Sequence, residues 1–170
     1  VGEPLPADPF TLGVASGDPL PDRVILWTRL APDPSNGGGM PDADVGVMWE
    51  VATDEAFTAV VASGNVGAGP GHAHSVHVDA GGLDPDSWYF YRFRAGGFDS
   101  PVGRTRTAPA NDCTVDTLRL GFATCQNWTQ GFYPAYAYLA DEGCDVVAFL
   151  GDYIYEGGPG GQTSVRFHNS

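Results

Sequence analysis

The stretch VVAFLGDYIYE, residues 146–156, indicates how the C-terminal part of this sequence folds. An apolar run that ends in Gly-Asp is typical of a buried β-strand, here over 145–150, that carries a carboxylate at its C-terminal end. In open α/β sheets, ligands and metals bind at that edge. The carboxylate would be Asp152, and Tyr153 and Tyr155 follow it directly. The stretch therefore predicts a strand end with one carboxylate and two phenols.

A second strand and a helix are expected before this stretch. The segment 117–124 runs into Cys125, and apolar residues at helical spacing predict a helix over about 132–142. A strand–helix–strand unit of this kind makes a right-handed crossover between parallel strands. Cys125 and Asp152 should then emerge at the same edge of the sheet.

The residue types at this edge favour a transition metal. Structural zinc sites usually combine several Cys or His residues at short spacing, and that pattern is missing from this sequence. A tyrosine phenolate, whose free pKa is about 10, needs a strong Lewis acid such as Fe³⁺. Asp152 has a second oxygen that could bridge to an oxygen-preferring ion such as Ca²⁺. Two such metals can clamp a phosphate and activate the attacking water.

Each of these residues also has a plain structural interpretation. A single cysteine at a strand end, here Cys125, is more often part of buried packing. A Gly-Asp pair after a strand is common in turns. Tyr153 and Tyr155 could be core aromatics.

The other cysteines and the histidines are ambiguous. Cys113 and Cys144 both precede an expected strand, and neighbouring strands lie about 4.8 Å apart, so a disulfide is within reach. Two free thiols fit the sequence equally well. His72, His74 and His77 lie away from the metal-ligand candidates, and a strand with exposed histidines is expected there rather than a metal site.

The first 109 residues follow a different pattern, with short strands separated by turns. Strands are expected at 24–30, 45–51, 74–79, 88–94 and 100–107. Regular spacing of this kind indicates a fibronectin type III- or Ig-like β-sandwich. The segment LDPDSWY, residues 83–89, has the spacing of a tyrosine corner, in which the Tyr89 hydroxyl bonds to upstream backbone. An ordinary hairpin with an incidental tyrosine is the alternative.

The linker is expected at 108–112, so the predicted domains are the sandwich, 1–109, and an incomplete α/β domain, 110–170. The net charge of −13 repels nucleic-acid phosphates and anionic membranes, and a nucleic-acid partner is not expected. No apolar run approaches the roughly 20 residues of a transmembrane helix. The start at Val1, without Met, is expected of a processed, secreted protein, although cleavage of an expression product leaves the same start.

Several long motifs run along the chain. In the C-terminal part they are FATCQ at 122–126, GFY at 131–133 and LGDYIYE at 150–156. In the N-terminal part they are FTLGVASGDP at 10–19 and VILWTRL at 24–30. Together they resemble the signature of the PhoD-type family, which comprises secreted metal-dependent alkaline phosphatases and phosphodiesterases, including bacterial phospholipases D. The resemblance covers nearly the whole chain.

The resemblance implies that 110–170 begins a metallophosphoesterase domain, with an Fe³⁺ held by Cys, Asp and Tyr beside Ca²⁺. By motif position the ligands are Cys125, Asp152 and Tyr155, and Asp152 is the residue expected to matter most for catalysis. Tyr153 is then expected to pack rather than to bind metal.

Other residues match the family less directly. Gln126 could orient the ligands. Arg166 could meet phosphate and His168 could transfer protons, but surface-loop roles are expected for both. Family members continue for several hundred residues beyond this point, so the chain is expected to act with its C-terminal remainder as a second chain, after nicking near the Gly-rich segment 157–161.

The predicted function is that of the N-terminal piece of a secreted, phospholipase D-like phosphodiesterase, which cleaves phosphate esters or phospholipids with metal-activated water. An alkaline phosphatase acting on phosphomonoesters is the close alternative, because the substrate-binding loops would lie largely outside this chain. A non-enzymatic β-sandwich binding module is the alternative from a different class. It would lack the visible colour of an Fe³⁺–phenolate site.

Overall fold

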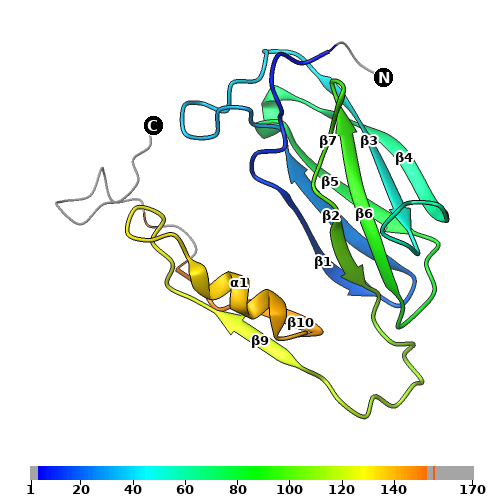
Figure 1. The fold of residues 1–170 in the computed structure, drawn as a ribbon. Helices are drawn as coiled ribbons and strands as arrows, with labels where there is room; N and C mark the ends of the chain where they lie inside the picture. Colours follow the sequence, from blue (N-terminus) through cyan, green and yellow to red (C-terminus); the bar gives the residue numbers. More distant parts are fainter. Residues whose placement is uncertain (1–3, 153–154, 156–170) are drawn as a thin grey trace. The chain divides into compact units, whose positions relative to one another are not determined.

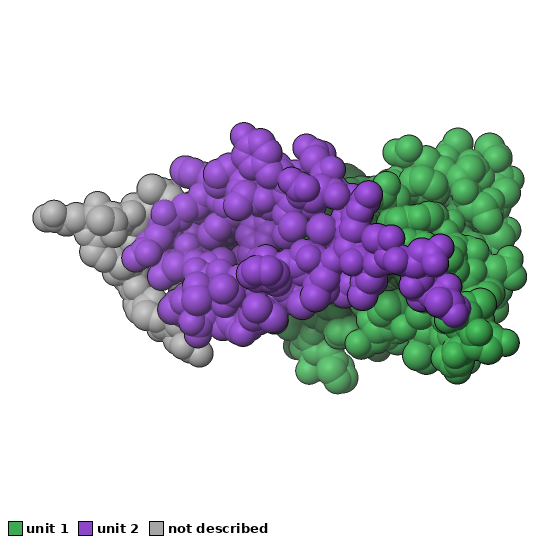
Figure 2. Space-filling view, turned by 90° about the horizontal axis from the view of Figure 1, so that it is seen from below, with its two compact units in different colours: residues 1–113 green, residues 114–170 purple. Residues whose placement is uncertain are grey.

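The computed structural model describes residues 4–152 and residue 155, and its ribbon is drawn in Figure 1. The chain divides into two compact units, residues 1–113 and 114–170, which are coloured separately in Figure 2. Among the described residues, no helix is both long and apolar enough to cross a membrane.

The N-terminal unit is built from antiparallel strand pairs (Figure 1). One sheet has the order β1 (Val14–Leu20), β2 (Arg23–Arg29) and β5 (Ser75–Gly81). The other has the order β4 (Val60–Ala68), β3 (Val45–Ala52), β6 (Trp88–Ala95) and β7 (Phe98–Asp99), with β8 (Gly103–Arg106) also paired to β6. A short 3₁₀ helix, η1 (Pro70–His72), precedes β5.

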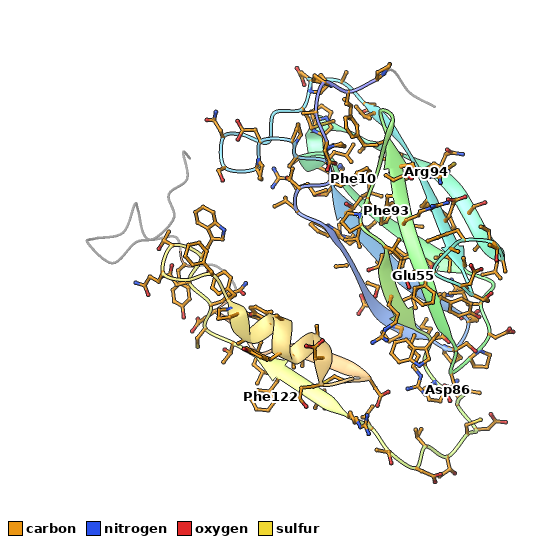
Figure 3. All side chains as sticks on the ribbon, viewed as in Figure 1. Phe10, Glu55, Asp86, Phe93, Arg94 and Phe122 are labelled. Carbon is orange, nitrogen blue, oxygen red and sulfur yellow. The ribbon has the colours of Figure 1, made fainter. Side chains whose placement is uncertain are left out.

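Alternating side chains of the two sheets form one hydrophobic core. Every second residue of β2 is buried, including Val24 and Leu26, and the same holds for β6, whose Phe93 is fully buried. Phe10, which precedes β1, joins the same cluster; Figure 3 labels Phe10 and Phe93. Burial of side chains of this size stabilises a fold by about 1.5–3 kcal/mol each. This core makes the N-terminal unit compact by itself.

The strands expected at 24–30, 45–51, 74–79, 88–94 and 100–107 correspond to β2, β3, β5, β6 and β8 within a few residues. The sequence analysis did not predict β1, β4 or β7. In β4 the signal is weakened by glycines, which lack strand propensity. Glycine is required at position 64, because a Cβ there would lie 2.9 Å from the ring of Trp49, its partner across the β3–β4 ladder.

The predicted tyrosine corner is present. The hydroxyl oxygen of Tyr89 accepts a hydrogen bond of 2.9 Å from the backbone N–H of Asp84. Tyr89 is buried, so its ring anchors the turn before β6 to the core while its hydroxyl satisfies a backbone donor. The alternative of an incidental tyrosine in an ordinary hairpin is wrong.

The histidines are only partly as expected. His72 and His77 are exposed, and the alternation along β5 buries Val76 and Val78 as predicted. His74 is not exposed. It lies just before β5 with 7% of its surface accessible, and its Nε2 is 3.1 Å from the carbonyl oxygen of Ala43. The expectation of an exposed histidine is therefore wrong for His74, which lies on the same face of the chain as the buried Val76 and Val78.

The C-terminal unit has the order β9 (Leu120–Ala123), α1 (Pro134–Asp141) and β10 (Val146–Phe149). β9 and β10 are parallel neighbours (Figure 1). All three elements are shorter than the predicted 117–124, 132–142 and 145–150. Pro134 opens the helix, where its missing N–H costs nothing, and Gly143 follows it with φ +65°, a conformation that glycine adopts readily.

All three cysteines are free thiols, so of the two possibilities for Cys113 and Cys144 the disulfide is not formed. The disulfide required both residues to flank adjacent strand starts. β9 begins at Leu120 rather than 117, so Cys113 lies well before the sheet. Only Cys144 precedes its strand closely, and it lies beneath α1 beside Gly121.

One face of the small parallel sheet is uncovered within the described part of the unit. A Cβ on Gly121 would lie 2.9 Å from Leu139 of α1, so the helix packs over that face. Leu120 and Phe122 alternate to the other face and are 58% and 66% exposed; Figure 3 labels Phe122. The helix itself has no buried residue. Two short strands with an open apolar face have little stability of their own.

We expect Tyr89→Phe to lower the free energy of unfolding of the N-terminal unit by about 1 kcal/mol, because the N–H of Asp84 loses its partly buried acceptor. Thermal unfolding followed by near-ultraviolet circular dichroism measures this. Asp84→Ala is the matched control, since it removes the side chain but keeps the N–H, and should change stability by no more than about 0.5 kcal/mol. Equal effects of the two substitutions would contradict the tyrosine corner.

We also expect the two units to differ in stability when the 170-residue chain is studied alone. Amide hydrogens of β2, β3 and β6 should exchange slowly, and those of β9 and β10 should exchange close to the rate of an unprotected chain. Hydrogen exchange read by mass spectrometry tests this directly. Protection of β9 and β10 equal to that of β2 would show that the small unit is stable alone.

Candidate metal centre

Cys125 and Asp152 lie just beyond the ends of β9 and β10, because the parallel pairing of Ala123 with Phe149 aligns the two strand ends. The Sγ of Cys125 donates a hydrogen bond of 3.3 Å to Oδ2 of Asp152. The structure therefore brings together a thiol and a carboxylate that are 27 residues apart in the sequence.

Both residues have backbone conformations that side chains rarely adopt. The φ angle is +57° at Cys125 and +51° at Asp152, and between the strand and Asp152 lies Gly151 with φ +117°. A residue other than glycine in the left-handed region costs of order 1–3 kcal/mol, and such residues cluster at functional sites. Here the two sharp turns direct both side chains to the same place, where a continued strand would carry them apart.

Three hydrogen bonds join the two turns. The N–H of Leu150 donates to the carbonyl oxygen of Ala123 at 2.8 Å, which extends the ladder past its last residue pair. The carbonyl oxygen of Gly151 accepts two more, from the N–H of Cys125 at 3.3 Å and from the hydroxyl of Thr124 at 3.1 Å. The strained turns are thus held against each other by both backbone and side chain.

Tyr155 completes the group. Partial burial of its phenol, together with hydrogen bonds to Cys125 and Asp152 and the negative charge of these two groups, raises the pKa of Tyr155 to about 12. The side chain keeps 43% of its surface exposed. All three residues that the family resemblance selects as ligands therefore interact with one another.

The donor set fits a highly charged cation better than it fits the protonated side chains. Desolvation of the Tyr155 phenol, hydrogen bonds to Cys125 and Asp152, and the negative charge of these two groups all raise the pKa of Tyr155, so they favour its neutral form. A trivalent cation would reverse this effect and favour thiolate, carboxylate and phenolate together. No cluster of three or more His, Cys, Asp or Glu occurs in the described ranges, so a zinc-type set is not seen there. For Ca²⁺, which needs six or more oxygens, Asp152 is one candidate ligand.

A hollow of about 640 Å³ lies next to Cys125, between the end of β9 and helix α1. On its wall, the hydroxyl of Tyr136 donates a hydrogen bond of 2.7 Å to Oε1 of Gln126. Gln126 is thus held by the helix and does not contact Asp152 through any described hydrogen bond. Nearby, the hydroxyl of Thr129 donates to Oδ1 of Asn127 at 2.8 Å, which closes the loop after Cys125 on itself.

Sequence reasoning missed two residues of this region. Tyr136 fell within the helix expected over 132–142 and Thr124 at the end of the strand expected over 117–124, and neither was singled out. Their hydroxyls matter because of contacts made across the sheet and across the loop, for which a single sequence carries no signal. Tyr153, Arg166 and His168 lie outside the described residues.

With this geometry established, comparison with known proteins identifies the class. The N-terminal domain model of PhoD-like phosphatases matches residues 2–109, and the PhoD-like phosphatase model matches residues 120–169. The chain therefore belongs to the PhoD-like phosphatase family.

A curated relative is alkaline phosphatase D of Bacillus subtilis (strain 168), which is 56% identical over 166 residues. That match covers 95% of this chain and 28% of the relative. A solved structure described as "Structure of PhoD" matches 98% of this chain and 33% of its own length, with 54% identity and a TM-score of 0.92. The chain thus spans no more than about a third of the length of these two relatives.

We expect the pKa of Tyr155 to lie near 12 in the metal-free protein. Because the folded pKa is raised above the ordinary value of about 10, the neutral phenol contributes stability below pH 10. That contribution, small for so exposed a group, is lost as the pH rises from about 10 to 12. Ultraviolet titration of tyrosinate, taken as the difference between the wild type and Tyr155→Phe, measures it. Ionisation at or below pH 10 in the metal-free protein would contradict the contacts with Cys125 and Asp152.

Proposed function

We propose that this chain is the N-terminal piece of a secreted, metal-dependent phosphoric ester hydrolase. The observation that carries the proposal is the contact of Cys125 with Asp152 at the shared edge of β9 and β10, with Tyr155 bonded to both. A site that gathers three anionic ligand types in one place is suited to a strong Lewis acid and, through it, to phosphate chemistry. Family membership supports the same class of reaction.

The proposal extends to the fold. The two antiparallel sheets of the N-terminal unit share one core and carry a tyrosine corner, which supports a fibronectin type III- or Ig-like β-sandwich. The parallel β9 and β10, with α1 between them in sequence, support the start of a metallophosphoesterase sheet. The predicted boundary at 109/110 is close to the division of the structure at Cys113/Thr114.

Cys125, Asp152 and Tyr155 are proposed to hold Fe³⁺, and the second oxygen of Asp152 to reach Ca²⁺. When bound, these metals would polarise the phosphate and supply an ionised water as nucleophile. A carboxylate has two oxygens, so Asp152, whose Oδ2 accepts the hydrogen bond from Cys125, could serve both ions. The Cys125 thiol and the Tyr155 phenol would lose their protons on metal binding, so loading of the site would weaken as the pH falls.

The left-handed turns at Cys125 and Asp152 support a site in which these two side chains are brought together before a metal binds. Preplaced ligands avoid an ordering cost at the moment of binding or reaction. In this proposal the hydrogen bonds that join the two turns hold the ligands in place against the backbone strain.

The rest of the catalytic domain is proposed to come from further protein that covers this sheet, as in the longer relatives. The open face of the sheet at Leu120 and Phe122 supports this, as does the small share of each relative that this chain spans. Covering that face would bury apolar surface, and it would bring further oxygen ligands to the edge where Asp152 lies.

For the substrate we propose a phosphodiester, such as a phospholipid. The name of the Bacillus relative favours a phosphomonoester as the second candidate. Turnover of an aryl phosphodiester and of the matching aryl phosphomonoester by the complete enzyme separates the two. A non-enzymatic binding module would turn over neither and would bind no iron.

We expect the complete enzyme to contain about one iron per site and to absorb visible light through its Fe³⁺–phenolate bond. Asp152→Asn should reduce iron retention and lower phosphodiester turnover by at least about 10- to 100-fold, because an anionic ligand is lost. Tyr155→Phe should bleach the visible band. Elemental analysis, visible spectra and turnover measure these effects.

Two controls accompany these variants. Tyr138→Phe removes an exposed hydroxyl from α1 and should leave colour, iron and turnover unchanged. Tyr153→Phe tests the register of the ligand assignment. Bleaching by Tyr153→Phe rather than by Tyr155→Phe would move the ligand, and stoichiometric zinc without iron would rule out the proposed centre.

A further inference from the structure

We infer that Thr124 is a positioning residue. Its hydroxyl links the turn at Cys125 to the turn at Asp152 by hydrogen bonds. The inference rests on the proposed function, since it concerns how the proposed ligands are held. Thr124 would not touch substrate or metal. It would act through the two residues that do.

The hydroxyl of Thr124 lies between the two strand ends. It donates to the carbonyl oxygen of Gly151 at 3.1 Å, and its oxygen is 3.3 Å from the Sγ of Cys125. The Gly151 carbonyl belongs to the residue immediately before Asp152. One side-chain oxygen is therefore in contact with one ligand directly and with the backbone that sets the direction of the other.

Packing does not explain a threonine here. In the described structure Thr124 is exposed, and its β-branched side chain fills no buried space. The strand β9 has already ended at Ala123, so strand propensity does not explain it either. The contacts of the Thr124 hydroxyl are the remaining explanation for a threonine at this position.

The two turns need a link of this kind because little else holds them together. The β9–β10 ladder has only four residue pairs, and just beyond it both chains turn into left-handed conformations at Cys125 and Asp152. Such turns relax unless the surroundings hold them. Beyond the ladder, two backbone hydrogen bonds and the Thr124 hydroxyl make that link. The hydroxyl is the part of the link that a substitution can remove.

The hydroxyl also has an electrostatic consequence for a loaded site. A hydroxyl carries one proton, and both the Gly151 carbonyl and the Cys125 sulfur are within its reach. Once the thiol has lost its proton to bind a metal, its sulfur becomes a hydrogen-bond acceptor. Sharing the Thr124 proton with that sulfur would change the electron density that the sulfur gives to the metal.

The test compares Thr124→Val, Thr124→Ala and Thr124→Ser in the complete enzyme. Valine keeps the shape and removes the hydroxyl, alanine also removes the branch, and serine restores the hydroxyl. Thr129→Val is the matched control, because its hydroxyl bonds within its own loop to Asn127 and reaches neither turn. The measurements are the rate of iron loss to a chelator, the visible band, kcat and KM, and hydrogen exchange of residues 120–127 in metal-free protein.

We expect Thr124→Val and Thr124→Ala to lose iron about 10- to 100-fold faster, to shift the visible band, and to lower kcat with little change in KM. Serine should restore all three properties, and Thr129→Val should match the wild type. In metal-free protein, exchange at 120–127 should be faster in Thr124→Val than in Thr124→Ser. Wild-type behaviour of both valine and alanine variants would overturn the inference, and so would a loss that serine does not restore.

The two proposals fail separately. If wild-type enzyme holds no iron, the proposed metal centre is wrong, and the inference then stands or falls on hydrogen exchange in the metal-free protein. If iron is present but the Thr124 variants retain it normally, the positioning role of Thr124 is wrong and the proposed metal centre still stands. If Thr124→Val does not fold, alanine and serine give the same comparison.

Discussion

The parallel pairing of β9 with β10 is the constraint on which the candidate site depends. Four residue pairs fix which residues stand side by side at the strand ends, and they place Cys125 next to Asp152. A shift of one residue in a strand's register turns each side chain to the other face of the sheet. Gly121 helps to set the register, because it leaves room for Leu139 of α1 over one face. The chemistry of the edge is therefore a consequence of how a helix packs on two short strands.

The same edge combines strain with charge. Cys125 and Asp152 are held in left-handed conformations, and desolvation of Tyr155, together with its hydrogen bonds to these two residues and their charge, raises the pKa of Tyr155. Both features are unfavourable in the metal-free protein. A highly charged cation would offset the unfavourable gathering of negative charge. The hydrogen bonds to the carbonyl oxygen of Gly151 hold the two turns in their strained backbone conformation. Sites whose metal-free form is less favourable than the loaded form bind their ion tightly and preserve its geometry.

The N-terminal unit has a different physical basis. Its sheets bury Val24, Leu26 and Phe93 in a closed core, whereas Leu120 and Phe122 of the C-terminal unit stay open. The first arrangement is stable through its own burial, and the second needs a covering layer. This asymmetry supports the proposal that further protein completes the C-terminal unit.

The order of residues by itself determined the strand ends, the helix between them and the tyrosine corner, because these depend on local periodicity and spacing. It also selected Cys125, Asp152 and Tyr155 as candidates through their motif. It did not show β4, whose glycines make sense only against Trp49, or the burial of His74 under the loop at Ala43. It showed neither the left-handed turns nor the Thr124 hydroxyl between them. Those were decided by the tertiary structure, because contacts between residues far apart in the sequence override local preference.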